Sequence, residues 1–113
     1  MGCLFCNIVA KKIPAEIVLE NEHVLAFKDV NPQAPSHALV IPKQHLTAIA
    51  EATREHAALL GETMLAAREV AEKLGLTESG YRLVVNNGAD GGQSVFHLHV
   101  HVLGGRQLGW PPG

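Results

Sequence analysis

The sequence has little of what marks several common protein classes. Its 113 residues include only two cysteines, and no stretch approaches the ~18 uninterrupted apolar residues of a transmembrane helix. Nine lysines and arginines against eleven aspartates and glutamates give a net charge of −2, whereas proteins that bind nucleic-acid polymers usually carry a basic excess. The first residues show no basic region followed by an apolar run, so no secretory signal is visible. We therefore expect a cytoplasmic protein without a nucleic-acid polymer or a membrane as partner; a small nucleotide, which needs only a few donors, fits this composition.

Apolar residues make up 47% of the chain, which suffices for one core and predicts a single domain over residues 1–113. Five segments have the alternation or apolar content of strands, namely 17–20, 23–27, 38–41, 81–86 and 96–103. Helical spacing predicts a short helix over 4–11 and a long one over 53–74, whose core face is Leu60, Met64, Ala67, Ala71 and Leu74. Since strands outnumber helices and connections are short, we expect an α+β fold with an antiparallel sheet of about five strands.

Three of the seven histidines occupy alternate positions near the C-terminus: His97, His99 and His101. Alternate side chains of a strand point to the same face, so the three imidazoles are expected side by side, with Leu98, Val100 and Val102 anchoring the other face. Imidazole is a base, an acid, a nucleophile or a metal ligand near neutral pH. One histidine alone is usually structural, but three on one face indicate a chemical site.

A glycine-rich loop, residues 88–93, precedes these histidines. Gly91 and Gly92 allow backbone N–H groups to approach an anion closely, and Gln93 and Ser94 add side-chain donors. Taken alone, the loop reads as a simple hairpin turn. Beside three aligned histidines, it favours a site that holds a phosphate or carboxylate against a nucleophile.

Two chemical interpretations of the histidines remain open at this point. A catalytic metal is one, although Asp90 is the only carboxylate nearby. Nucleophilic attack by a neutral imidazole on phosphorus or a carbonyl is the other, with backbone amides and Ser94 stabilising the developing charge.

The two cysteines, Cys3 and Cys6, form a Cys-x-x-Cys pair. In a reducing compartment this spacing indicates a metal site or a redox pair rather than a structural disulfide. A thioredoxin-like motif would follow a strand, and none precedes Cys3. A zinc site would need two more ligands, for which histidines are available.

In the motifs around these residues the sequence resembles the histidine triad (HIT) superfamily. His97–Leu103 fits the pattern His-φ-His-φ-His-φ-φ, in which φ is apolar, and further matching motifs cover nearly the whole chain: 31–37, Ile41-Pro42-Lys43-x-His45, 84–86 and 90–95. The ending, Gly104-Gly105-Arg106-Gln107 with Trp110-Pro111-Pro112-Gly113, is similar to the histidine triad nucleotide-binding (HINT) branch.

The resemblance implies a purine nucleoside phosphoramidase, which hydrolyses the P–N bond of nucleoside 5′-phosphoramidates to a nucleoside monophosphate and an amine. It implies that His99 attacks phosphorus and forms a nucleotidyl-histidine, that His101 binds the phosphate, and that His97 orients the strand. His37 matches the family's fourth histidine, a proton relay. The positions implied to bind the nucleotide are Phe5, Ile8, Phe27, Asp29, Val30, Asn86, Gly92, Gln93, Ser94, Val95, His99, His101 and Trp110. Leu39 resembles part of the base slot too, but core is the better expectation for it.

Further expectations come from the same resemblance. Family members are commonly homodimers, in which the C-terminal tail with Trp110 reaches the partner's site. Some members hold a structural zinc, here with Cys3, Cys6, His45 and His97 as ligands; the alternative is two reduced thiols. No cofactor is expected for catalysis. Two other functions stay open: a dinucleotide polyphosphate hydrolase of a sister branch, and a nucleotide-binding regulator with incidental hydrolysis.

Overall fold

The computed structural model describes residues 2–113 and has the expected α+β architecture. Five strands, β1 (Ile17–Glu20), β2 (Val24–Lys28), β3 (Ser36–Pro42), β4 (Tyr81–Val84) and β5 (Val100–Gly104), form one antiparallel sheet in the order β1-β2-β3-β5-β4. The helices are α1 (Leu4–Val9), α2 (Ala57–Lys73) and two 3₁₀ turns, η1 (Ile49–Glu51) and η2 (Arg54–His56). No helix in the described part of the chain is both long and apolar enough to cross a membrane.

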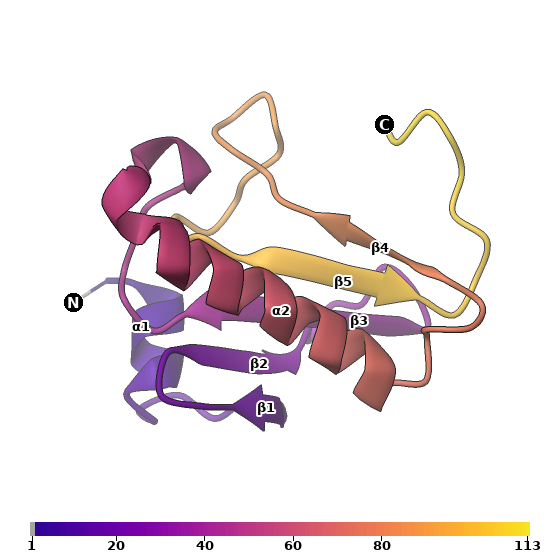
Figure 1. The fold of residues 1–113 in the computed structure, drawn as a ribbon, viewed down its shortest axis with the longest axis horizontal. Helices are drawn as coiled ribbons and strands as arrows, with labels where there is room; N and C mark the ends of the chain where they lie inside the picture. Colours follow the sequence, from indigo (N-terminus) through magenta and orange to yellow (C-terminus); the bar gives the residue numbers. More distant parts are fainter. Residues whose placement is uncertain (1) are drawn as a thin grey trace.

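The long helix α2 lies across one face of the sheet, and α1 lies at one end of it near β2 and β3 (Figure 1). Strand alternation divides the apolar residues between two cores. Val24, Ala26, Val40, Val100 and Val102 pack against α2. On the other face, the second core contains Phe5, Ile8, Leu25, Phe27, Leu39 and Ile41, so α1 covers only part of that face. His97 and His99 lie on the same face of the sheet as α1 and pack against Phe5 of that helix.

The core face of α2 differs from the expected one. Ala67 and Ala71 are buried as predicted, but Met64 is 46% exposed, and Thr63, Ala66 and Val70 are buried in its place. Thr63 can be buried because its hydroxyl donates to the Leu59 carbonyl oxygen at 2.8 Å. Small residues on this face allow α2 to lie close to the sheet, which hydrophobicity alone did not indicate.

The histidine strand is shorter than expected, because regular pairing in β5 begins only at Val100. Val100 pairs with Val40 of β3, and two residues further on β3 reaches Pro42, which has no N–H to donate to the ladder. The Leu98 N–H donates instead to the Leu46 carbonyl oxygen at 2.6 Å. His97 and His99 therefore precede the strand, and only His101 belongs to it.

Candidate functional site

A cavity of about 450 Å³ opens on the α1 side of the sheet. Its volume lies within the roughly 300–1,000 Å³ typical of small-molecule sites. His37, His99 and His101 line one part of it together with Asp29 and Ser94. Apolar residues from α1, β2 and β3 line another part: Phe5, Ile8, Phe27 and Leu39. The arrangement combines an apolar slot with a cluster of imidazoles, which suits an amphipathic ligand with a flat apolar end and a polar end.

His99 is held from two sides. Its Nδ1 lies 2.7 Å from the carbonyl oxygen of His97, and a carbonyl can only accept, so Nδ1 carries the proton. The unprotonated nitrogen is then Nε2. The Phe5 ring packs edge-on against the imidazole, with ring centroids 5.2 Å apart. The tautomer of His99 is thus set by the main chain next to it, and the lone pair remains on Nε2.

His37 and His101 form a second, connected pair. The N–H of Gln33 donates to His37 Nδ1 at 3.0 Å, which leaves the His37 proton on Nε2. That Nε2 lies 2.9 Å from His101 Nδ1 and 3.5 Å from a carboxylate oxygen of Asp29. Donation from His37 to His101 Nδ1 places the His101 proton on Nε2. His101 is therefore a hydrogen-bond donor at the nitrogen that remains for a ligand.

The two imidazoles are neutral near pH 7. Burial lowers the pKa of His37, against the opposing charge of Asp29. Burial, followed by the neighbouring His99 and His37, lowers the pKa of His101 to about 4. A neutral His37 can pass its Nε2 proton to His101, while the Asp29 carboxylate lies beside the same nitrogen.

The Gly92 and Gln93 donors that were expected to face an anion are used within the protein. The N–H groups of Gly92 and Gln93 donate to the carbonyl oxygens of Ala89 and Gly88, both at 3.0 Å, and close the turn. The Gln93 side chain is buried, accepts from the Gly88 N–H and donates to the carbonyl oxygens of Thr47 and Val95. Gly92 and Gln93 do not line the cavity, so the loop acts as a support. The next two residues, Ser94 and Val95, do line it.

Two other residues expected at the nucleotide, Asn86 and Trp110, do not line the cavity either. Trp110 is 82% exposed and lies 6.0 Å from the Arg82 guanidinium, measured to the ring centroid. Val30 is on the rim and 98% exposed. Leu39 was expected in the core, and it both packs there and lines the cavity.

Some lining residues escaped the sequence reasoning. They come from the segment after α1, from the end of β2 and from the β2–β3 loop: Ile13, Pro14, Ala15, Lys28, Asn31 and Gln33. The Ile-Pro-Ala segment has no chemical signature, since it contributes only apolar wall. Gln33 could be recognised only from the structure, in which its backbone N–H donates to His37 Nδ1.

A second cluster contains Cys3, Cys6, His45 and His97, whose ligand atoms all lie within 4.8 Å of one another. His97 Nδ1 is 3.4 and 3.5 Å from the two sulfurs and 3.1 Å from His45 Nδ1, and the Cys6 sulfur is 3.3 Å from His45 Nδ1. A tetrahedral zinc with ordinary Zn–S and Zn–N lengths would hold such atoms about 3.3–3.6 Å apart. The four side chains therefore fit a Cys₂His₂ zinc ion closely.

The surroundings of this cluster also suit a metal. His97 is fully buried, and its Nε2 lies 2.8 Å from the Pro42 carbonyl oxygen, so Nε2–H is the donor and the Nδ1 lone pair faces the cysteines. Burial and the adjacent Cys3 raise the pKa of Cys6 to about 11, so two thiolates side by side require a cation. His97 consequently contributes its side chain to this cluster, and its carbonyl oxygen bonds His99, which lines the cavity.

Known proteins are similar to this chain in both sequence and fold. The HIT domain model matches residues 10–108. The chain is 56% identical to a HIT-like protein of Synechococcus elongatus over 97% of its own length and 96% of the relative, and 53% identical to a 14 kDa zinc-binding protein of Zea mays over 97% and 87%. The crystal structure of a HIT family hydrolase from Legionella pneumophila superposes with a TM-score of 0.97 at 48% identity and covers 99% of this chain and 100% of that one.

Proposed function

The chain belongs to the HIT family, and from that premise we propose that it is a purine nucleoside phosphoramidase of the HINT branch. The observation that carries the proposal is the hydrogen bond from His99 Nδ1 to the His97 carbonyl oxygen, because it leaves an unprotonated Nε2 on the wall of an apolar cavity. A neutral imidazole of this kind is a competent nucleophile for phosphorus. The structurally similar Legionella pneumophila protein is named a hydrolase, which agrees with this class of reaction.

The proposed reaction has two displacements at phosphorus. His99 Nε2 attacks, the P–N bond breaks, and the amine leaves with a proton supplied within the His37–His101 pair. Water then attacks the nucleotidyl-histidine and gives its proton back to the His37–His101 pair. The bond between phosphorus and His99 Nε2 breaks, the monophosphate is released, and His99 and the pair return to their starting states. The Nε2–H of His101 binds a phosphoryl oxygen in both steps, and Ser94 adds a hydroxyl donor beside it.

The remaining parts of the cavity suit a purine ribonucleoside. Phe5, Ile8, Phe27 and Leu39 form an apolar slot for a flat base, and the edge-to-face contact of Phe5 with Phe27, with centroids 5.4 Å apart, keeps it rigid. We place the ribose hydroxyls at the Asp29 carboxylate, which is ordered by the Asn31 N–H at 2.8 Å.

A mononucleotide derivative matches the charge of the site better than a dinucleotide polyphosphate. Among the described residues that line the cavity, Lys28 is the one lysine or arginine, and it pairs with Glu16 at 3.1 Å. A chain of several phosphates carries charges that this wall does not balance. A single phosphoryl group needs only the histidine and serine donors.

A substrate panel tests the proposal. Adenosine and guanosine phosphoramidates are compared with diadenosine polyphosphates by kcat/KM, and we expect the phosphoramidates to be far better substrates. Preferred cleavage of the polyphosphates would assign the chain to the sister activity. Tight monophosphate binding without appreciable turnover of any substrate would instead favour a nucleotide-binding regulator.

We also propose that Cys3, Cys6, His45 and His97 hold a structural zinc. A bound Zn²⁺ would neutralise the two thiolates and tie the N-terminal segment to the sheet, and the chain's own residues would still do the chemistry. The Zea mays relative is named a zinc-binding protein, which supports the assignment. Two cysteines that are free rather than disulfide-bonded agree with a cytoplasmic location.

The assembly that we propose is a homodimer. The outer edge of β4 is at the border of the sheet, and the tail beyond β5 runs outward past it (Figure 1). An edge strand presents unpaired backbone groups that a second copy can pair with. Such pairing would let Trp110, which does not line its own cavity, reach that of a partner. Sedimentation of the wild type tests the assembly. Sedimentation of a Trp110→stop truncation shows whether the tail is needed for it.

A further inference from the structure

We propose that Arg106 is a positioning residue for the histidine pair: its guanidinium holds the Gln33 backbone, and Gln33 in turn sets the tautomer of His37. This inference deepens the proposed phosphoramidase function and rests on it for its kinetic consequences. The residue acts from outside the cavity, because it is not among the lining residues.

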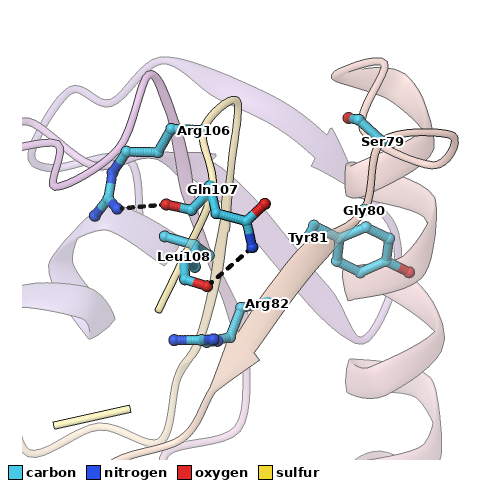
Figure 2. Close-up of a pocket in the computed structure, with 7 residues that line it drawn as sticks. All are labelled: Ser79, Gly80, Tyr81, Arg82, Arg106, Gln107 and Leu108. Carbon is cyan, nitrogen blue, oxygen red and sulfur yellow. Dashed lines mark hydrogen bonds between the residues drawn. The ribbon is translucent and has the colours of Figure 1, made fainter. Parts of the chain in front are cut away.

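Two hydrogen bonds define the position of the guanidinium. Arg106 Nη2 donates to the Gln33 carbonyl oxygen and Nη1 donates to the Gln107 carbonyl oxygen, both at 3.1 Å. Figure 2 shows the second of these bonds, with the Arg106 side chain bent back toward the Gln107 carbonyl group. A planar guanidinium presents its donors in a fixed fork, so two carbonyl groups from different segments are held at once. The segment after β5 is thereby fastened to the β2–β3 loop.

A second contact joins the same two segments. Gly105 has a φ of +92°, and a Cβ at this position would lie 2.9 Å from the Cβ of Pro35. Only glycine combines this conformation with so close an approach. The backbone of residues 104–106 therefore packs directly on the loop that contains Gln33, and the Arg106 bond does not depend on a long, freely moving side chain alone.

Gln33 transmits this restraint to the active site. The residue receives Arg106 on its carbonyl oxygen and donates its own N–H to His37 Nδ1 at 3.0 Å. If the Gln33 backbone moves, His37 Nδ1 loses its donor and the tautomer protonated at Nδ1 becomes competitive. His37 Nε2 would then accept from His101 Nδ1 instead of donating to it, and His101 would lose the Nε2 proton that binds the phosphate.

The expected effect is moderate, because Arg106 is exposed and the loop keeps its Gly105 contact. A hydrogen bond of ordinary net strength corresponds to about a three- to tenfold change in population or rate. We expect that range in kcat for Arg106→Ala, because only the molecules with the productive His37–His101 tautomer react.

Imidazole ¹⁵N NMR of histidine-labelled protein tests the inference without any substrate. In the wild type, His37 should have a protonated Nε2, and Arg106→Ala should shift its nitrogen signals toward the Nδ1–H form. Arg106→Lys should restore part of the wild-type signal, since one donor remains. Arg68→Ala, which removes an exposed arginine from α2, is the charge-matched control and should change nothing at His37. His37 signals that are identical in Arg106→Ala and the wild type would overturn the inference.

A kinetic cycle provides the second arm. If Arg106 acts through His37, Arg106→Ala should lower kcat three- to tenfold in the wild type but cause no further loss in a His37→Gln background. An equal loss in both backgrounds would show a role independent of His37 and would contradict the inference. If the wild type turns over no phosphoramidate, the proposed function fails, and the NMR arm still decides the role of Arg106.

Discussion

His99 Nδ1 lies 2.7 Å from the carbonyl oxygen of His97, and the imidazole of the same His97 faces two cysteine sulfurs and His45. One residue therefore serves two sites: its carbonyl oxygen orients a histidine of the cavity wall, and its side chain belongs to the candidate zinc cluster. The Nε2–H bond of His97 to Pro42 fixes the ring between them. Neighbouring histidines of one sequence motif therefore have different hydrogen-bond partners.

Replacement of His99 by alanine should abolish P–N hydrolysis and leave the fold intact. The change removes the proposed nucleophile. The other two histidines of the cavity, His37 and His101, cannot replace it, because their unprotonated nitrogens already accept hydrogen bonds. We therefore expect kcat to fall on the order of 10³-fold or more. Steady-state hydrolysis of an adenosine phosphoramidate measures the loss, and thermal unfolding checks the fold.

The matched control is His23→Ala, which removes an exposed histidine paired with Glu22 at 3.9 Å, close to the β1–β2 turn. It should retain the activity of the wild type. Full turnover by His99→Ala would contradict the covalent mechanism through His99. Trapping of a nucleotidyl-protein adduct in the wild type and in His23→Ala, but not in His99→Ala, would be the positive counterpart.

Metal analysis of the purified protein should give one zinc per chain, and Cys3→Ser/Cys6→Ser should lose it. Loss of a structural metal removes a cross-link between α1 and the sheet, so the unfolding midpoint should fall by about 10 °C or more. His99→Ala should retain its full zinc content, because His99 is not among the four ligands. A double cysteine variant with unchanged metal content would refute the site, and metal loss from His99→Ala would place the ion at the triad instead.

The sequence predicted the fold and most of the cavity for identifiable reasons. Two-residue alternation is a local property, so the separation of Val100 and Val102 from His99 and His101 followed directly from the sequence. The motif resemblance indicated Phe5, Asp29 and His37, which lie far from the triad in the chain but line the same cavity. The four candidate zinc ligands were indicated in the same way.

Other features depend on tertiary contacts that no local pattern encodes. The Gln93 amide looked like a ligand donor, but both of its N–H donors are used by the carbonyl oxygens of Thr47 and Val95. The late start of β5 follows from Pro42, a residue of another strand. Which face of α2 is buried depended on the distance to the sheet, which favours Ala66 and Val70 over the longer Met64. These differences arise wherever a partner segment, rather than the residue type, decides the role.

Asp29→Asn should weaken the preference for ribonucleotides. The amide keeps an oxygen for the Asn31 N–H but loses the negative charge that accepts from ribose hydroxyls. We expect kcat/KM for a ribonucleoside phosphoramidate to fall about tenfold, and that for its 2′-deoxy analogue to fall less. The ratio of kcat/KM for the two substrates separates ribose binding from an effect through His37, which lies 3.5 Å from the carboxylate. An effect through His37 would lower kcat/KM for both substrates alike. An equal fall for both substrates would assign Asp29 to the histidine pair alone.

The stability of the fold should depend on pH through His101, whose pKa burial and two neighbouring histidines lower from 6.5 to about 4. Between these values the unfolded chain binds a proton that the folded chain does not, so the free energy of unfolding should fall as the pH is lowered from 6.5 toward 4. Glu20, whose pKa is lowered by hydrogen bonds from Lys11 and Lys43, adds to this loss only below about pH 4.5, its ordinary value. Urea unfolding at fixed ionic strength over pH 4.5–7 therefore isolates the histidines. His101→Gln should flatten the slope in this window, and His23→Gln, at an exposed histidine, should leave it unchanged; a slope in His101→Gln equal to that of the wild type would show that His101 is protonated as readily in the folded protein as in the unfolded chain.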